Sequence, residues 1–389
     1  MQLKYSNIDV ETCSVADIDS EIVRLEKMVG DYNSLQNGVK VFINSIYGAC
    51  ASPFFTCYNV DIAEAITLQG QDLAKHTGNT CNNYFSNFWH KDKELHKKLG
   101  VTVTSTVQKD VWIYSDTDSI HVCLQYVIDT CEHVEDEVQF IINLYEHRLK
   151  ALIKTALEKY ATKWNTTNYQ NAEFEKLSEG ELVVAKKKYV MDIKWENGIT
   201  RESHTKIKPV GIEIVQSSTP LFSRKNIKDV LKEIFTQGEK LDIKQFVANL
   251  KRYKAEFCAS EVDYISKQMG VGDYEKGIAN DRDKFEFNKA VPAHVRGAGY
   301  HNYLINQNPK LKKKYSLLKS GDKVKFYYTD DKFCNIFSYA PGFFPHEIAP
   351  GVDWDEQFDL VFLSPINRLL EPVIGQKIKP SLSVSKNLF

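Results

Sequence analysis

The stretch Val111-Trp-Ile-Tyr-Ser-Asp-Thr-Asp-Ser-Ile-His-Val-Cys-Leu124 decides the fold. Its flanks are rich in β-branched and aromatic residues, which predicts two short strands. The polar segment 115–119 between them predicts a hairpin turn. Asp116 and Asp118 stand one residue apart, so their side chains would lie on one side of an extended chain. We therefore expect an antiparallel hairpin with two neighbouring carboxylates at its tip.

These two carboxylates fit two different kinds of site. Exposed carboxylates that lie close together repel each other, and a divalent cation removes that repulsion. Mg²⁺ in particular favours one or two carboxylates together with substrate phosphates. The same stretch also fits an acidic surface turn without a metal, because short motifs often occur by chance.

Composition limits the class of protein. A chain of 389 residues suggests about two or three domains, and its apolar content is ordinary for a soluble globular protein. No apolar run is long enough to span a bilayer, and the N-terminus has no signal pattern. The eight cysteines show no Cys-x-x-Cys pair, which indicates reduced thiols. We expect a cytoplasmic protein that does not bind a membrane.

The net charge of −1 hides an uneven distribution. Residues 1–31 are acidic, whereas residues 181–254 hold 16 Lys and Arg against 9 Asp and Glu. A further lysine cluster lies at 310–325. Basic regions in a near-neutral chain indicate a polyanion partner. Solvated lysines on helix faces would explain the 310–325 cluster equally well.

A helical pattern begins at Asp17 or Ser20, and Gly30 and Gly38 predict an interruption near residues 30–37. Further helices are expected beneath the sheet over residues 59–88, and in an amphipathic stretch that ends near Lys163.

One polar stripe stands out after this interruption. Lys40, Asn44 and Tyr47 are at i, i+4 and i+7, so they share one helix face. Such a stripe is costly to bury without partners, so it either lines a cleft or belongs to an ordinary amphipathic helix. Asn is a poor helix former, which favours the cleft.

A second basic element follows the hairpin. Residues 182–193 are expected to form one strand, and Asn197-Gly198 predicts a hairpin turn to a return strand at 200–205. On such a strand Lys187 and Tyr189 would share one face and Lys186 the other. Adjacent lysines also fit a solvated edge strand.

Three motifs in this order resemble family B DNA polymerases, most closely those of the T-even bacteriophage type. Lys-x-x-x-Asn-Ser-x-Tyr-Gly at 40–48 resembles the fingers motif of the family. Tyr-x-Asp-Thr-Asp-Ser at 114–119 resembles the palm motif, and Lys-Lys-x-Tyr at 186–189 resembles the family's DNA-gripping motif. The segments 211–220 and 294–297 also resemble this group.

The resemblance implies an α+β fold with three parts and a tail. Residues 1–50 would be a helical piece of the fingers, and 51–214 an incomplete palm with an antiparallel sheet and packed helices. Residues 215–379 would form a mostly helical thumb. The tail 380–389, with its Leu388-Phe389 end, resembles a peptide that docks on a sliding clamp, although a frayed terminus fits as well.

The resemblance also implies synthesis of DNA from dNTPs on a primer–template, with two Mg²⁺ ions. Asp118 would be the first metal ligand and Asp116 a weaker one. The nucleotide would contact Lys40, Asn44, Ser45 and Tyr47. The DNA would contact Lys186, Lys187, Tyr189, Ser217, Ser218 and Arg296. The two serines also fit plain helix N-caps.

Two parts of the family pattern are missing. The other palm motif, Asp-x-x-Ser-Leu-Tyr-Pro, does not occur in residues 1–39. The exonuclease domain of the family is missing from this sequence as well. We therefore predict the C-terminal chain of a split polymerase, completed by a separate N-terminal polypeptide; a truncated fragment is the alternative. Ser115 replaces the usual Gly before Asp-Thr-Asp, which a type I turn would accept.

A non-catalytic DNA- and clamp-binding module is the second functional hypothesis. Both hypotheses retain the basic thumb, but only a polymerase requires Lys40, Tyr47 and Asp118 together. Their joint presence favours the polymerase. Reverse transcription is less consistent, because that chemistry typically shows two adjacent aspartates after Tyr, and Thr117 separates them here.

Overall fold

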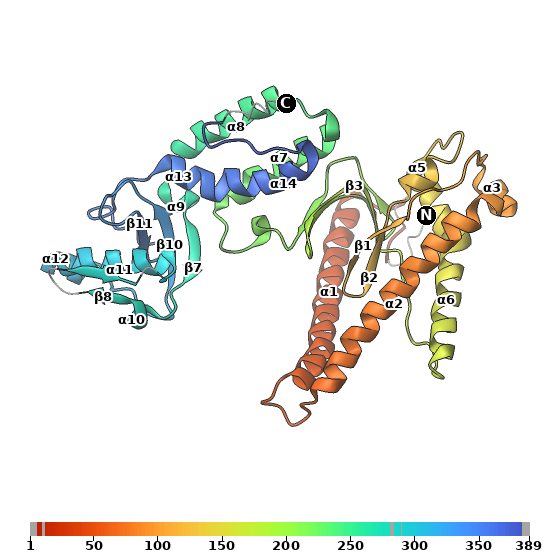
Figure 1. The fold of residues 1–389 in the computed structure, drawn as a ribbon, viewed down its shortest axis with the longest axis horizontal. Helices are drawn as coiled ribbons and strands as arrows, with labels where there is room; N and C mark the ends of the chain where they lie inside the picture. The colour runs from red at the N-terminus through yellow and green to blue at the C-terminus, as the bar shows by residue number, and fades with distance from the viewer. Residues whose placement is uncertain (1–5, 10–11, 281–283, 289, 383–389) are drawn as a thin grey trace. The chain divides into compact units, whose positions relative to one another are not determined.

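The computed structural model describes residues 6–9, 12–280, 284–288 and 290–382. The chain forms two compact units, the N-terminal unit (residues 1–173) and the C-terminal unit (residues 174–389). Both contain helices and antiparallel strands, so the predicted α+β class is confirmed (Figure 1). Among the described residues, no helix has both the length and the apolar composition that crossing a membrane requires.

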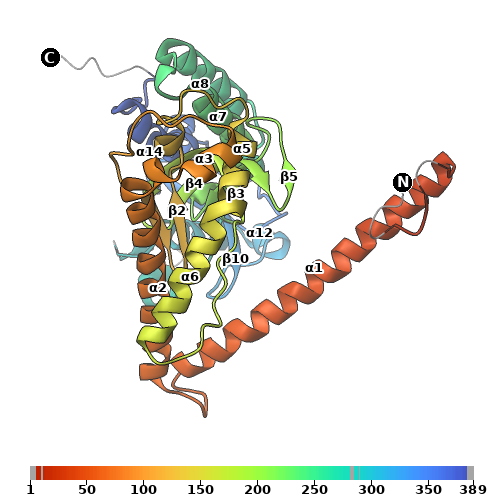
Figure 2. The same cartoon turned by 90° about the vertical axis from the view of Figure 1, so that its right-hand side faces the viewer.

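The N-terminal unit begins with one long helix, α1 (Val15–Ala51). Ser14 and Asp17 form a capping box at its start. The helix continues through Gly30 and Gly38, so the predicted interruption near residues 30–37 is wrong. A glycine costs a helix interior only about 1 kcal/mol, which does not end a helix of 37 residues. Figure 2 shows α1 extending away from α2 and α6, and nearly all of its side chains are exposed.

The core of the N-terminal unit lies around α2 (Val60–Asn87) and α6 (Lys150–Lys163). The Tyr160 hydroxyl donates to Asp72 at 2.6 Å, and a ring nitrogen of His76 lies 3.1 Å from the Ala156 carbonyl oxygen. A π-helical turn, Tyr145–Leu149, joins α5 to α6, which confirms the predicted amphipathic stretch. The other elements are the 3-10 turn Trp89–Lys91, α3 (Lys93–Leu99), β1 (Trp112–Asp116), β2 (Ser119–Val122), α4 (Gln125–Ile128) and α5 (Glu137–Leu144).

The β1–β2 hairpin is seated on α2. The Asn82 side-chain oxygen accepts a hydrogen bond from the Trp112 N–H at 2.9 Å. A Cβ atom at Gly78 would lie 2.3 Å from the Trp112 ring, so only glycine lets this ring lie against the helix. These two contacts fix the base of the hairpin and leave its tip exposed.

The C-terminal unit begins with an antiparallel sheet. Its strands are β3 (Lys176–Ala185), β4 (Lys188–Glu196), β5 (Ile199–Thr200) and β6 (Ile207–Val210), and β4 pairs with the other three. Asn197 and Gly198 have φ values of 52° and 85°, and Glu196 pairs with Ile199, so the predicted Asn-Gly turn is confirmed. The expected return strand at 200–205 ends early, at Thr200.

A helical core follows the sheet. It is formed by α7 (Leu221–Gln237), α8 (Ile243–Cys258), α9 (Val262–Ile265), α13 (Trp354–Phe358), the π-helical turn Asp359–Leu363 and α14 (Ser364–Ile374). Phe222, Phe257 and Phe362 are fully buried at its centre. Short 3-10 turns lie at Glu213–Val215 and Gly238–Lys240.

A second sheet, of order β11-β10-β7, completes the C-terminal unit. Its strands are β7 (Lys267–Gly270), β10 (Lys323–Tyr328) and β11 (Ile336–Tyr339), and α11 (Ala293–Asn306) packs on it. Gln357 joins this sheet to the helical core. Its amide donates to the Ile265 carbonyl at 2.7 Å and accepts from the Tyr328 N–H at 3.0 Å. The remaining elements are α10 (Tyr274–Gly277), β8 (Ile278–Asn280), β9 (Phe285–Phe287) and α12 (Pro309–Lys314).

Candidate functional site

The predicted hairpin is confirmed. Strands β1 and β2 pair antiparallel, with Tyr114 opposite His121 and Asp116 opposite Ser119. The Asp118 N–H donates to the Asp116 carbonyl at 2.8 Å, which closes a tight turn around Thr117. Both predicted metal ligands, Asp116 and Asp118, therefore lie at the tip of the hairpin in the structure.

Thr117 gives this tip an unusual backbone. Its φ is 57°, a left-handed conformation that costs a non-glycine residue roughly 1–2 kcal/mol. A type I turn, which would accept Ser115, has negative φ at both central residues, so this turn is of another type. Ser115 lies in β1, where its hydroxyl oxygen accepts from the Trp112 indole N–H at 2.9 Å. The Ser115 departure from the family pattern is thus accommodated in the strand.

The two carboxylates differ in their surroundings. Asp118 is exposed, whereas Asp116 is half-buried at the end of β1 and has the Thr117 hydroxyl 3.2 Å from its Oδ1. Because the chain turns at Thr117, the predicted shared face of an extended strand does not apply. In the described part of the chain, no third carboxylate, histidine or cysteine joins them in a cluster within 4.8 Å. This oxygen-only donor set fits Mg²⁺ with most of its ligands from water or phosphate.

The predicted nucleotide contacts lie on the last turns of α1. Lys40, Asn44 and Tyr47 are helical, so their predicted common face is confirmed, and all three are exposed. The Ser45 hydroxyl donates to the Val41 carbonyl of its own helix at 2.7 Å. The polar stripe is therefore accessible to a ligand, and its contact with a nucleotide stays a prediction.

The lysine run adopts a different structure from the one predicted. Strand β3 ends at Ala185 and β4 begins at Lys188, so Lys186 and Lys187 form a two-residue turn and the continuous strand over 182–193 is wrong. Lys187 has a φ of 61°. The predicted alternation of faces does not hold, and Tyr189 is buried, only 8% exposed.

Gly211 lies in close contact with this turn. Its φ is 65°, and a Cβ at this position would lie 1.9 Å from the Lys187 carbonyl oxygen. The end of β6 therefore reaches the lysine turn at backbone distance, where no side chain fits. The three lysines at 186–188 are exposed, and the backbone of Gly211 lies against the backbone of Lys187.

The other predicted DNA contacts also lie in the C-terminal unit. Ser217 is exposed, and the Ser218 hydroxyl donates to the Gln216 side chain at 3.4 Å. Pro220 precedes α7 without a side-chain cap, so the alternative of an N-cap by Ser217 or Ser218 is wrong.

Arg296 packs inside this unit. Its guanidinium lies 5.3 Å from the centre of the Phe287 ring, and its Nε is buried without a hydrogen-bond partner. Burial lowers the pKa of the neighbouring His294, so the imidazole is neutral near pH 7. Arg296 is thus the charged side chain at residues 294–297 that could bind a phosphate. Its contact with DNA stays a prediction.

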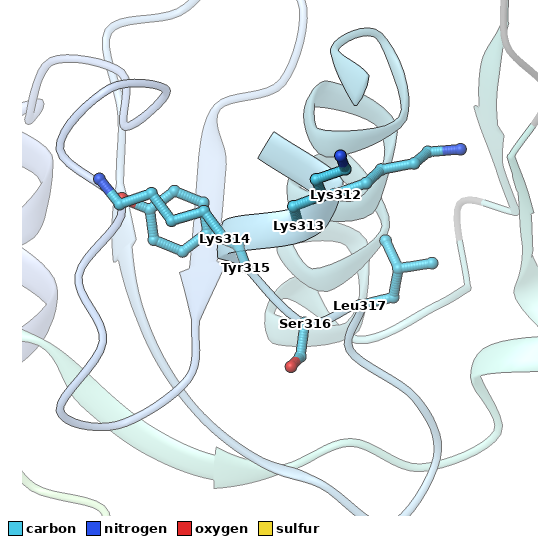
Figure 3. A pocket seen from close by; sticks show the side chains of 6 residues that line it. All are labelled: Lys312, Lys313, Lys314, Tyr315, Ser316 and Leu317. Carbon is cyan, nitrogen blue, oxygen red and sulfur yellow. The ribbon is translucent and has the colours of Figure 1, made fainter. Parts of the chain in front are cut away.

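A basic hollow lies at the end of α12. Its volume is about 480 Å³, and its lining residues are Lys312, Lys313, Lys314, Tyr315, Ser316 and Leu317. Figure 3 shows Lys314 beside the Tyr315 ring, with Lys312 and Lys313 pointing away from that pair. Lys314 and the Tyr315 hydroxyl both bond to Glu347, and Lys325 pairs with Asp263. The 310–325 cluster therefore combines internal ion pairs with lysines that face solvent. Leu388 and Phe389, the predicted clamp contacts, lie outside the described residues.

The hairpin tip carries one exposed and one half-buried carboxylate, and carboxylates of this kind can hold the divalent ions of metal-dependent enzymes that act on phosphates. The pattern of the family described as DNA polymerase family B matches residues 23–330, and the chain belongs to this family.

Relatives come from viruses and cells. The chain is 26% identical over 295 residues to the DNA-directed DNA polymerase of Enterobacteria phage T4. This aligned region covers 72% of this chain and 30% of that protein. It is 22% identical to the DNA-directed DNA polymerase of Escherichia phage RB69, over 77% of this chain and 32% of that protein. The DNA polymerase delta catalytic subunit of Candida albicans is 22% identical over 93% of this chain and 29% of that protein. The chain thus spans about a third of the length of these relatives.

Proposed function

We propose that this chain is the C-terminal part of a template-directed DNA polymerase. It would transfer a nucleotide from a dNTP to the 3′-hydroxyl of a primer paired with its template. The observation that carries the proposal is the exposed Asp118 on the β1–β2 tip of a family B chain.

The predicted residues that are at least partly exposed have roles that their environments permit. Asp118 would be the principal ligand of two Mg²⁺ ions and Asp116 the lesser one. When bound, such ions lower the pKa of the attacking hydroxyl and neutralise the leaving pyrophosphate. Lys40 would pair with the triphosphate, and Asn44 and Tyr47 would line the pocket of the new base pair. Lys186 and Lys187, at a solvated turn, would hold the phosphate backbone of the duplex.

We further propose that a separate N-terminal polypeptide completes the site. It would supply the second palm aspartate, the exonuclease and the rest of the fingers. The motif pattern supports this proposal, since Asp116 and Asp118 supply carboxylates from one tip and the family's other palm motif does not occur in residues 1–39. The surface of α1 supports it as well. One set of its exposed apolar residues recurs at spacings of three, four or seven, the pattern that packs against another helix: Ile22, Val29, Tyr32, Val39, Ile43 and Ile46.

Primer extension tests both proposals. The chain is incubated with Mg²⁺, dNTPs and a primed template, alone and with the N-terminal polymerase polypeptide from the same source. We expect extension only in the mixture. Extension by the chain alone would mean that another carboxylate of this chain replaces the missing aspartate.

A variant pair assigns the chemistry. In the mixture, Asp118→Ala should abolish extension while duplex binding stays nearly intact. Asp110→Ala, an exposed aspartate that precedes β1, is the matched control and should extend normally. Equal extension by both variants would remove Asp118 from the mechanism.

A non-catalytic DNA- and clamp-binding module is the second candidate. The solvated lysine turn at 186–188 and the basic hollow near α12 favour duplex binding whether or not the chain is catalytic. Duplex binding without extension in any mixture would support the module. Removal of Leu388 and Phe389 tests the clamp contact in either case.

A further inference from the structure

Three metal-ligating side chains meet on the first sheet of the C-terminal unit. Glu179 lies on β3, Asp192 on β4, and His204 in the segment between β5 and β6. Each offers one ligand atom, and these atoms all lie within 4.8 Å of one another. None of the three belongs to the proposed polymerase site, which lies on other residues.

Asp192 is the reason to expect a ligand here. Its side chain is 1% exposed, and its Oδ2 lies 2.5 Å from His204 Nδ1. The other oxygen, Oδ1, is buried without a hydrogen-bond partner. A carboxyl oxygen that is removed from water without a partner is unfavourable. A cation bound beside His204 would satisfy this carboxylate.

Glu179 provides the third donor. Lys194 Nζ and the Ser203 hydroxyl each donate to it at 2.8 Å, and both bonds end on Oε1. The other oxygen, Oε2, is therefore the one that would bind a cation. Lys194 also donates to Ser203 at 2.7 Å, so its ammonium can leave Glu179 and keep a partner when a cation enters.

We propose that Glu179, Asp192 and His204 bind one divalent transition-metal ion of the Zn²⁺ class. Zn²⁺ accepts an imidazole nitrogen and two carboxylate oxygens, and three protein ligands leave its fourth position for water. Mg²⁺ prefers an all-oxygen set, so the imidazole distinguishes this site from the Asp118 tip. The ion would tie the segment at 201–206 to β3 and β4, the two strands that carry the lysine turn.

Metal titration of the full chain tests the proposal. The chain is treated with a chelator, and Zn²⁺ is titrated by calorimetry in excess Mg²⁺, with Co²⁺ as the spectroscopic probe. We expect one equivalent to bind, with d–d absorption of four-coordinate Co²⁺ and no thiolate-to-metal charge-transfer band. Asp192→Asn and His204→Gln should each weaken Zn²⁺ binding at least tenfold.

Two further variants keep the test decisive. Glu202→Gln removes an exposed carboxylate two residues from His204 and should bind Zn²⁺ as the wild type does. Glu179→Gln changes the most accessible ligand, so it reports on the site if the variants at Asp192 fail to fold. No binding in excess Mg²⁺, binding that all three ligand variants leave unchanged, or a thiolate band alone would overturn the proposal.

Discussion

The contact between Gly211 and the lysine turn gives a sharp prediction for Gly211→Ala. The new Cβ would lie 1.9 Å from the Lys187 carbonyl oxygen, whereas real Cβ atoms essentially never approach closer than 3.0 Å. The end of β6 and the turn must therefore separate by about 1 Å. Because β6 pairs with β4 through Tyr189–Val210 and its neighbours, this separation strains the start of the β4–β6 ladder.

The expected loss in the free energy of unfolding has two parts, a backbone part and a hydrogen-bond part. Alanine at a positive φ costs roughly 1–2 kcal/mol. Loss of about two ladder hydrogen bonds adds about 2 kcal/mol. The matched control is Gly198→Ala, since Gly198 has a φ of 85° in the same sheet but open space around the new Cβ. Gly198→Ala should therefore lose only the roughly 1–2 kcal/mol that alanine costs at a positive φ.

Hydrogen exchange measures this difference locally. Opening of the β4–β6 amides should be about thirtyfold more frequent in Gly211→Ala than in Gly198→Ala, because 1.4 kcal/mol corresponds to a factor of ten. Duplex affinity should also fall in Gly211→Ala alone, because the lysine turn moves. Equal exchange in the two variants would refute the steric argument and leave only a backbone preference for glycine.

Three further predictions concern other parts of the chain. Burial lowers the pKa of His301 to about 4, so between about pH 6.5 and 4 the unfolded chain binds a proton that the native state does not. The free energy of unfolding should therefore decrease by up to about 3 kcal/mol as the pH falls through that range, and denaturant titrations of His301→Gln should lack this part of the loss. Burial raises the pKa of the Cys81 thiol to about 12, so a thiol reagent should label the exposed Cys57 rapidly and Cys81 only on unfolding; rapid labelling of Cys81 would contradict its burial. Asp92 caps α3 and accepts from Tyr84 and Arg148, so Asp92→Ala should destabilise the N-terminal unit by about 2–4 kcal/mol, and a thermal midpoint equal to that of the wild type would show these bonds to be dispensable.

Sequence patterns correctly predicted the elements that neighbouring residues determine. The β1–β2 hairpin, the Asn197-Gly198 turn and the helical position of Lys40 follow from neighbouring residues, and the structure agrees with each. The error at Gly30 came from treating a helix penalty as a helix end.

Long-range contacts explain the remaining differences. The turn at Lys186-Lys187 lies against Gly211, more than twenty positions later, and no pattern within the lysine run contains that information. The sheet in the predicted thumb pairs Lys267–Gly270 with a strand that begins at Lys323, and such distant pairing is invisible to periodicity. The φ of Thr117 likewise had no signal, since a β-branched residue is the type least expected there.

Gln357 has a consequence for how the C-terminal unit unfolds. Its side-chain N–H group donates to Ile265 within the helical core and its oxygen accepts from the Tyr328 N–H of β10, so separation of the helical core from the second sheet breaks the bond to Tyr328, at a cost of about 1 kcal/mol. Neither layer can melt while the other persists without that cost. This bond therefore couples denaturation of the two layers, and it should make an intermediate that keeps only one of them about tenfold less populated than it would be without the bond.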